Sequence, residues 1–328
     1  MPPVIDMHCD TLMHVFLTKG KDADVFDCPD LSVDVRRLFH ARAMAQFFAI
    51  FVPPEEVYKE FKHEVISDEE YIAGCTSVFN NTIQRYPDWI RQAKSADEIE
   101  ANFKAGFPSA VLTMEDGVAV QKDMANLDRF YEAGVRALSL TWNFKNCFGS
   151  PNSKDETVMN TGLTDFGKEA VKHMQDIGML VDVSHLSDGG FRDVVKLAKV
   201  PFVATHSDSR AVVNHPRNMT DDMIRALAKA GGVMGINFSP MFLNGTPGNR
   251  RSEISRMVEM AVHEKEIGGI EVVAMGTDFD GIGGELEVKS PDDMHLLCDA
   301  LAEAGFSVSD IDAVMYGNAL RVFHEAMH

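Results

Sequence analysis

The hydrophobic positions of this chain gather in eight short stretches, and segments with a helical pattern separate them. Each stretch is nearly continuous rather than alternating, which is typical of parallel strands that are covered on both faces. We therefore predict eight buried parallel strands. They span residues 4–10, 43–52, 109–116, 135–142, 178–185, 200–207, 231–239 and 270–280.

The segments between these stretches carry helix signals. Thr220 precedes two aspartates and predicts a capped helix that ends near Gly231. A second helix is expected to end near Gly134, and a third to begin at Ser290-Pro291. Two more helices are expected over residues 253–267 and 310–327. The segment 53–107 is too long for one crossover, so two or three helices are expected there. One of these is predicted to begin at Pro87-Asp88-Trp89.

Eight strands with helices between them predict a (β/α)₈ TIM barrel with an enlarged loop after the second strand. A doubly wound sheet is the alternative, but no glycine-rich phosphate loop follows the first strand. Nothing in the composition marks a boundary inside the chain, so residues 1–328 are expected to form a single domain.

Charge and composition narrow the range of partners. The 328 residues are 45% hydrophobic and 25% charged, as in an ordinary soluble protein. A formal charge of −19 makes nucleic acid and anionic membranes unfavourable partners. The five cysteines form no C-x-x-C pair, and no apolar run reaches membrane-spanning length. The expectation is a cytoplasmic enzyme-sized chain that contacts neither nucleic acid nor membrane; a homodimer is compatible with the sequence.

The first strand ends in two side chains that suit a metal ion. Residues two apart in a strand share a face, so His8 and Asp10 should project from one face, with Met7 and Cys9 on the other. An imidazole beside a carboxylate favours a divalent transition metal, zinc first. The alternative for these two residues alone is a buried histidine beside a capping aspartate.

Other strands end in the same kinds of side chain, and strand ends carry the active site of a TIM barrel. Each of these residues follows small or apolar residues at i−2 and i−4, which predicts an inward-facing column of side chains. A single strand-end histidine could equally be a satisfied core residue. Three histidines and three carboxylates at one barrel mouth would be costly without cations, so two Zn²⁺ ions are expected. The further residues in this set are Glu115, His185, His206 and Asp278.

The ordered set of motifs resembles the membrane (renal) dipeptidase family, zinc peptidases of the amidohydrolase superfamily. The likeness covers nearly the whole chain, from the first strand to the last helix. It rests on Ile5-Asp6-Met7-His8-Cys9-Asp10, Thr113-Met114-Glu115-Asp116-Gly117, Val181-Asp182-Val183-Ser184-His185, Thr205-His206-Ser207, His215-Pro216-Arg217-Asn218, Gly276-Thr277-Asp278-Phe279-Asp280-Gly281 and Gly317-Asn318-Ala319-Leu320-Arg321-Val322-Phe323.

The resemblance implies a role for each matching residue. His8 and Asp10 would bind one zinc, His185 and His206 the other, with a bridging carboxylate between the two ions. Asp278 would be the general acid and base, and Arg217 would hold the substrate carboxylate; the alternative for the arginine is a solvated surface residue. The bridging carboxylate would be Glu115, which makes it a catalytic residue as well as a ligand.

One position departs from the animal enzymes, which have a histidine at the end of the fourth strand. Trp142 stands there, followed by Asn143, and both are candidate substrate contacts. An indole donates one hydrogen bond but carries no proton, so packing in the wall is the simpler role for Trp142. Asp280 is expected to contact the amino group of the substrate or to cap a loop.

The resemblance implies a zinc dipeptidase in which a hydroxide that bridges the metals attacks the peptide carbonyl. The substrate would be a dipeptide with a free C-terminal carboxylate, and a D-residue at that position should be tolerated. The same site could open another amide, a lactam or a lactone, because a fold does not fix a substrate. A metal-binding scaffold without turnover is the alternative outside enzymes.

Overall fold

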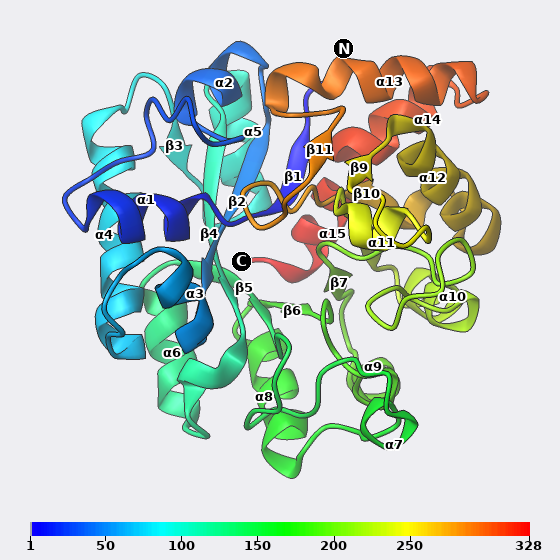
Figure 1. Cartoon of the computed structure of the whole chain (residues 1–328), viewed down its shortest axis with the longest axis horizontal. Helices are drawn as coiled ribbons and strands as arrows, with labels where there is room; N and C mark the ends of the chain where they lie inside the picture. The colour runs from blue at the N-terminus through cyan, green and yellow to red at the C-terminus, as the bar shows by residue number, and fades with distance from the viewer. Residues whose placement is uncertain (1) are drawn as a thin grey trace.

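A computed structural model describes residues 2–328, and its centre is a closed barrel of eight parallel strands (Figure 1). Neighbouring strands pair in the order β1, β2, β4, β5, β6, β7, β8, β10, and β10 pairs with β1 to close the ring. The predicted TIM barrel is confirmed, because each of the eight apolar stretches contains one barrel strand. The strands are β1 (Ile5–Cys9), β2 (Ala45–Phe51), β4 (Ser109–Glu115), β5 (Val135–Ser139), β6 (Leu180–Asp182), β7 (Val203–Ala204), β8 (Val233–Ile236) and β10 (Val273–Met275).

The described residues form fifteen α-helices, most of which lie around the barrel. Thr220 caps α10 as predicted, because its side chain accepts a hydrogen bond from the backbone N–H of Met223. None of the helices described is both long and apolar enough to span a membrane. The helices are α1 (Thr11–Lys19), α2 (Val35–His40), α3 (Glu55–Glu60), α4 (Asp68–Arg85), α5 (Ala96–Lys104), α6 (Met124–Glu132), α7 (Glu156–Met159), α8 (Asp165–Asp176), α9 (Asp188–Leu197), α10 (Asp221–Lys229), α11 (Pro240–Leu243), α12 (Ile254–Gly268), α13 (Met294–Glu303), α14 (Val308–Asp312) and α15 (Asn318–Ala326).

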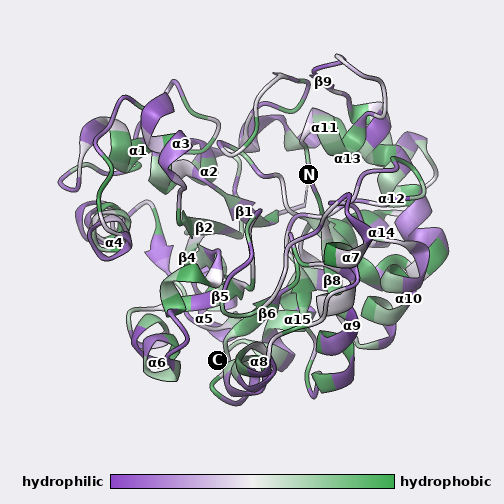
Figure 2. Ribbon diagram, turned by 60° about the horizontal axis from the view of Figure 1, so that its bottom comes forward, coloured by the Kyte–Doolittle hydropathy of each residue, from purple (hydrophilic) through white to green (hydrophobic). Residues whose placement is uncertain are grey.

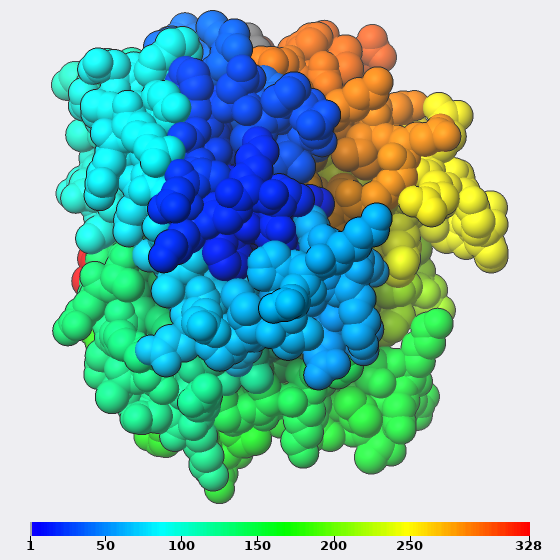
Figure 3. All heavy atoms as spheres, turned by 60° about the vertical axis from the view of Figure 1, so that its left-hand side comes forward, coloured from blue at the N-terminus to red at the C-terminus, as the bar shows by residue number. Residues whose placement is uncertain are grey.

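The enlarged loop after β2 holds α3, α4 and α5, as expected, together with the short strand β3 (Arg91–Gln92). In Figure 3 this light-blue-to-cyan part of the chain lies beside the darker blue N-terminal segment and above the green segments. The prediction of a helix at Pro87-Asp88-Trp89 is wrong, because these residues form a turn that leads into β3. Pairing of β3 with β4 takes the chain there, and Ser95 caps the next helix instead.

The lumen of the barrel is apolar at the end opposite the mouth, where the strands begin. One buried cluster takes side chains from all eight strands, among them Ile5, Val111 and Ala274, and includes Phe323 of α15. The rings of Phe47 and Phe323 stack with centroids 5.0 Å apart, so α15 closes this end of the barrel. Figure 1 shows α15 in the middle of the ring of strands, and Figure 2 shows apolar strands inside and polar helix surfaces outside.

A β-bulge in β1 changes which side chains face the lumen. Asp6 pairs with Gln46 of β2 and Cys9 pairs with Phe48, so β1 has one residue more than its neighbour between these pairs. Met7 consequently belongs to the lumen cluster, whereas Cys9 packs in the outer layer against the helices. The expectation that Met7 shares a face with Cys9 is wrong, and the extra residue is the reason.

Candidate metal centre

Two carboxylates, those of Glu115 and Asp278, reach the mouth of the barrel above residues of the lumen cluster. Val111 lies in the lumen cluster, and Glu115 follows it four residues later on β4. Ala274 of β10 lies in the same cluster, four residues before Asp278. The inward-facing columns predicted for these two residues are confirmed. Glu115 follows the alternation of β4, because in a strand every second side chain faces the same way. Asp278 lies beyond the end of β10 and adopts a positive φ of 63°.

His185 and His206 reach the mouth although the residues two and four positions before them face away from the lumen. Val181 and Val183 precede His185, yet both pack in the outer layer, as do Phe202 and Ala204 before His206. The predicted inward columns below these histidines are therefore wrong.

Breaks in the regular backbone bring the histidines inward. The strands β6 and β7 end before these residues, and His185 adopts a positive φ of 67°. In β1 the bulge turns His8 to the mouth. A non-glycine residue at positive φ costs roughly 1–3 kcal/mol, and such residues concentrate at functional sites.

Glu115 lies at the centre of the six predicted site residues. Its Oε2 is 3.5 Å from Nε2 of His8, while its Oε1 is 3.0 Å from Nε2 of His185 and 3.4 Å from Nε2 of His206. Nε2 of His8 also lies 3.4 Å from Asp10 Oδ2. The structure thus brings these residues together, with the two oxygens of one carboxylate facing two separate groups of donors.

This donor set fits metal ions. Nε2 of His8 and Oδ1 of Asp10 are buried and have no hydrogen-bond partner within residues 2–328. Ligand atoms on a tetrahedral zinc lie roughly 3.4 Å apart, given metal–ligand bonds of about 2.1 Å. The distances around Glu115 are close to that spacing. In three buried sets of three residues, one ligand atom from each residue lies within 4.8 Å of the other two. The sets are His8 with Asp10 and Glu115, Glu115 with His185 and His206, and His8 with His206 and Asp278.

Burial shifts the protonation of these groups in the metal-free chain. Loss of solvent raises the pKa of Glu115 to about 7 and that of Asp278 to about 6. Burial also lowers the pKa of His185 and His206 well below the usual range, so both imidazoles are neutral at pH 7. Neutral imidazoles have the free lone pair that a metal needs, and a metal that binds here would displace protons from the carboxyl groups.

Asn237 is a site residue that sequence reasoning missed. Its Nδ2 donates to Oδ2 of Asp278 at 2.8 Å and lies 3.3 Å from the backbone oxygen of His206. It follows directly after β8. The rule that strand ends carry function, applied to the seventh apolar stretch, would have found this residue.

Arg217 is buried beside the centre rather than solvated at the surface. Only 5% of the residue is exposed. Its Nη1 donates to Ser207 Oγ at 2.7 Å and its Nη2 to the backbone oxygen of His206 at 2.8 Å, whereas Nε has no partner in the described part of the chain. Burial lowers the pKa of Arg217, while the carboxylates of Asp278 and Glu115 oppose that effect.

A cleft of about 1190 Å³ opens above the site, and Asp10, Glu115, His185 and Asp278 lie in its floor. Trp142 and Asn143 line the cleft, as expected of substrate contacts. The Trp142 ring packs 4.8 Å from that of Phe51 and 6.2 Å from that of His185, measured between centroids. The Oδ1 of Asn143 lies 3.1 Å from Nδ1 of His185, so this exposed side chain also contacts the metal centre.

Asp280 acts as a loop cap. One carboxylate oxygen accepts from Thr11 Oγ1 at 2.6 Å and from the backbone N–H of Val33, and the other accepts from the backbone N–H of Ser32. Its backbone oxygen bonds to Nε2 of His14, a residue of the cleft wall. These contacts occupy the carboxylate, which favours the loop-capping alternative for Asp280 over contact with the substrate.

Comparison with known proteins places these features in a family. The model of the family described as membrane dipeptidase (peptidase family M19) matches residues 1–328. An uncharacterized dipeptidase of Schizosaccharomyces pombe is 28% identical over 98% of this chain and 79% of its own length. An uncharacterized Klebsiella pneumoniae protein encoded in the pqqA 5′ region is 34% identical over 71% of this chain and 88% of its own length.

Solved structures show the same fold. A metallopeptidase from Rhodobacter sphaeroides, solved with a phosphinate mimic of the dipeptide L-Ala-D-Ala, matches with a TM-score of 0.87 at 23% identity, over 99% of both chains. A dipeptidase described as a metallopeptidase of the same family matches with a TM-score of 0.86 at 23% identity, again over 99% of both chains. Because the family model spans the whole sequence, this chain belongs to the membrane dipeptidase family of metallopeptidases.

Proposed function

We propose that this protein hydrolyses dipeptides with a free C-terminal carboxylate and that it uses two zinc ions. The position of Glu115 carries the proposal. One oxygen of its carboxylate faces His8, beside Asp10, and the other faces the pair His185 and His206. A carboxylate placed between two groups of buried donors is the arrangement of a bridging ligand in a two-metal hydrolytic site.

When bound, the ions would supply activation of water and polarisation of the scissile carbonyl. The chain itself supplies a proton carrier. Asp278 lies 9% exposed in the floor of the cleft, and Asn237 holds one of its oxygens. The other oxygen, Oδ1, is 3.9 Å from Nε2 of His8. Asp278 can therefore accept a proton during attack and return it to the leaving amine.

Recognition of the substrate carboxylate is assigned to Arg217. It is a buried cation beside the metal ligands, and its Nε has no hydrogen-bond partner among the residues described. Two other cations, Lys154 and Arg250, line the outer cleft and are the competing candidates. The cleft volume alone would accept more than a dipeptide, so selection for dipeptides is expected to come from this charge pairing.

Tolerance of a D-residue at the C-terminal position is part of the proposal. A clamp that reads only the carboxylate is insensitive to the hand of the neighbouring side chain. The Rhodobacter sphaeroides structure, whose ligand mimics L-Ala-D-Ala, supports this expectation by its similar fold.

A substrate panel on zinc-loaded protein tests the function. It contains L,L- and L,D-dipeptides, one dipeptide amide, a tetrapeptide and a lactone. We expect cleavage of both dipeptides, with the amide poorer by about 2–5 kcal/mol, as for a broken buried charge pair. Arg217→Met should remove the preference for the free acid, whereas Arg250→Met should keep it. Equal rates on the dipeptide, its amide and the tetrapeptide would refute the assignment, as would turnover of the lactone alone.

A further inference from the structure

Two pairs of residues brace the metal centre with nearly identical hydrogen bonds. In the inner clamp, Oδ1 of Asp182 accepts from the backbone N–H of Thr205 at 2.9 Å, and Oδ2 accepts from Thr205 Oγ1 at 2.6 Å. In the outer clamp, Asp6 and Thr277 make the same two bonds, each at 2.8 Å. In both clamps the threonine directly precedes a residue of the site, His206 or Asp278.

The likeness extends to the other partners of the aspartates. Oδ1 of each also faces the backbone N–H two residues further along its own strand, that of Ser184 at 2.9 Å and that of His8 at 3.4 Å. Oδ2 of each accepts from a side chain of the neighbouring strand on the opposite side, Ser139 Oγ for Asp182 and Gln46 Nε2 for Asp6.

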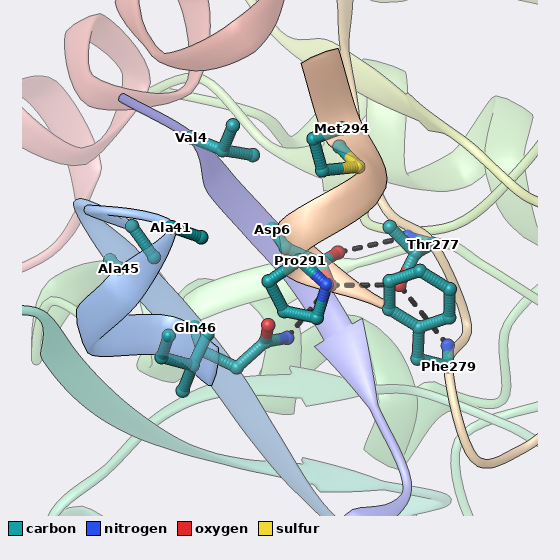
Figure 4. Close-up of a pocket in the computed structure, with 11 residues that line it drawn as sticks. Val4, Asp6, Ala41, Ala45, Gln46, Thr277, Phe279, Pro291 and Met294 are labelled. Atoms are coloured by element: carbon teal, nitrogen blue, oxygen red, sulfur yellow. Dashed lines mark hydrogen bonds between the residues drawn. The ribbon is translucent and has the colours of Figure 1, made fainter. Parts of the chain in front are cut away.

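The two clamps lie on opposite faces of the barrel wall. Asp6 and Thr277 are outside the lumen, in the small pocket of Figure 4, where Pro291 and Met294 cover them. By strand alternation from Leu180 and Val203 of the lumen cluster, Asp182 and Thr205 face inward. Only the inner clamp therefore lies against the imidazoles of the metal centre.

The clamps differ in the third contact of the threonine hydroxyl. Thr277 Oγ1 accepts from the backbone N–H of Phe279 at 3.1 Å, a bond drawn in Figure 4. Thr205 Oγ1 instead lies 2.7 Å from Nδ1 of His206. The hydroxyl has one proton, and an ionised carboxylate can only accept. The hydroxyl donates this proton to Asp182, so it can only accept a hydrogen bond from His206. The imidazole proton of His206 must then be on Nδ1.

We infer that Asp182 and Thr205 are positioning residues that fix the tautomer of His206. With Nδ1 protonated, Nε2 keeps its lone pair, and this atom lies 3.4 Å from Glu115 Oε1 and 3.2 Å from Nε2 of His185. A hydrogen bond from the second ring nitrogen is how proteins orient histidines that bind metals. This inference rests on the proposed metal site and extends it to two residues that touch neither metal nor substrate.

The first test is nuclear magnetic resonance of the metal-free protein labelled with ¹⁵N at histidine. We expect the neutral His206 ring to carry its proton on Nδ1. Thr205→Val should release this restraint and populate the other tautomer, while Thr205→Ser should keep the wild-type signals because it keeps the hydroxyl. A wild-type His206 protonated on Nε2 would overturn the inference whatever the variants do.

The second test measures zinc affinity by competition with a chelator. Loss of the hydroxyl in Thr205→Val should lower the affinity for the ion proposed to bind His185 and His206 by about 10–100-fold, the usual effect of removing such a partner. The matched control is Thr277→Val, which removes the corresponding hydroxyl of the outer clamp and should leave the His206 tautomer unchanged.

The outcomes separate this inference from the proposed function. Unchanged affinity in Thr205→Val, or an equal change in both variants with unchanged His206 signals, would contradict the inference alone. Wild-type protein that binds no zinc would contradict the metal site, whereas the tautomer measurement uses metal-free protein and stands independently.

Discussion

A single methyl group at Gly281 should disable the site without disturbing the fold. A Cβ built on this glycine would lie 2.1 Å from Oδ2 of Asp10 and 2.5 Å from Oδ1 of Asp278. Ordinary contacts begin near 3.4 Å, so the Asp10 carboxylate would have to retreat by about 1.3 Å. Gly281 is exposed and its φ is not positive, so Gly281→Ala is expected to fold normally.

The size of the effect follows from that displacement. Misplacement of a catalytic group by about 1 Å can cost roughly 100-fold in rate, which corresponds to about 2.7 kcal/mol of transition-state stabilisation. We therefore expect Gly281→Ala to lower kcat/KM for a dipeptide by about 100-fold or more. Bound zinc should fall below two ions per chain, because Asp10 is a proposed ligand of one ion.

Gly283→Ala is a matched control two residues away in the same loop. Its nearest neighbour would be Nη2 of Arg250 at 3.5 Å, an ordinary contact, so activity and zinc content should stay near the wild-type values. The measurements are steady-state hydrolysis of one dipeptide and elemental analysis, with thermal unfolding as a check of the fold. Activity of Gly281→Ala within threefold of wild type would show that the carboxylates are not held where the structure places them.

Three further substitutions test separate parts of the site and the core. Asp278→Asn should keep its zinc but lose turnover by about 10²–10⁴-fold, as for other acid–base groups; loss of zinc on elemental analysis would make Asp278 a ligand instead. Glu115→Gln should lose both zinc and activity, since a neutral amide bridges two cations poorly, and zinc content equal to wild type would contradict the bridging role. Burial raises the pKa of Glu264 well above its usual range, and neither of its carboxylate oxygens has a hydrogen-bond partner among the described residues. The folded chain then holds a proton that the unfolded chain releases above about pH 4.5, so this group's contribution to stability is lost as pH rises. Glu264→Gln should therefore raise the free energy of unfolding, measured by urea denaturation, by about 1–3 kcal/mol at pH 8 and by less at pH 4. Glu266→Gln, on the exposed side of α12, should leave the free energy of unfolding unchanged at both pH values. An equal gain for Glu264→Gln at pH 8 and pH 4 would exclude ionisation of Glu264 as the cause.

Hydrophobic patterning predicted the barrel because each strand is buried on both faces, and such strands are nearly continuous apolar stretches. It also predicted Glu115 correctly, because this residue follows the two-residue alternation of β4. Asp278 lies at the mouth as predicted, although it follows the end of β10 and has a positive φ. The helix expected at Pro87 failed because pairing with β4, which is remote in sequence, overrode a local helix signal.

The histidines show where sequence reasoning reaches its limit. His185 and His206 do lie in the site, but each breaks the alternation of its strand, and the apolar residues before them face the helices. Nothing in the local sequence marks where a short strand ends or where φ turns positive. Thr205 and Asp182 were missed for a related reason, since their role depends on contacts between neighbouring strands rather than on their own strand positions.

The extra residue in β1 separates two demands that a regular strand would force together. Ile5 and Met7 can keep filling the lumen while His8 points to the mouth, although two of these side chains are adjacent in the chain. Evolution can therefore alter the ligands at the mouth without redesigning the packing beneath them, and the packing can drift without moving the ligands. The same irregularity makes the site sensitive to the number of residues in β1. Removal of one residue between Asp6 and Cys9 would restore a regular strand. That strand could not place one side chain in the lumen and the next one at the mouth, as Met7 and His8 now are.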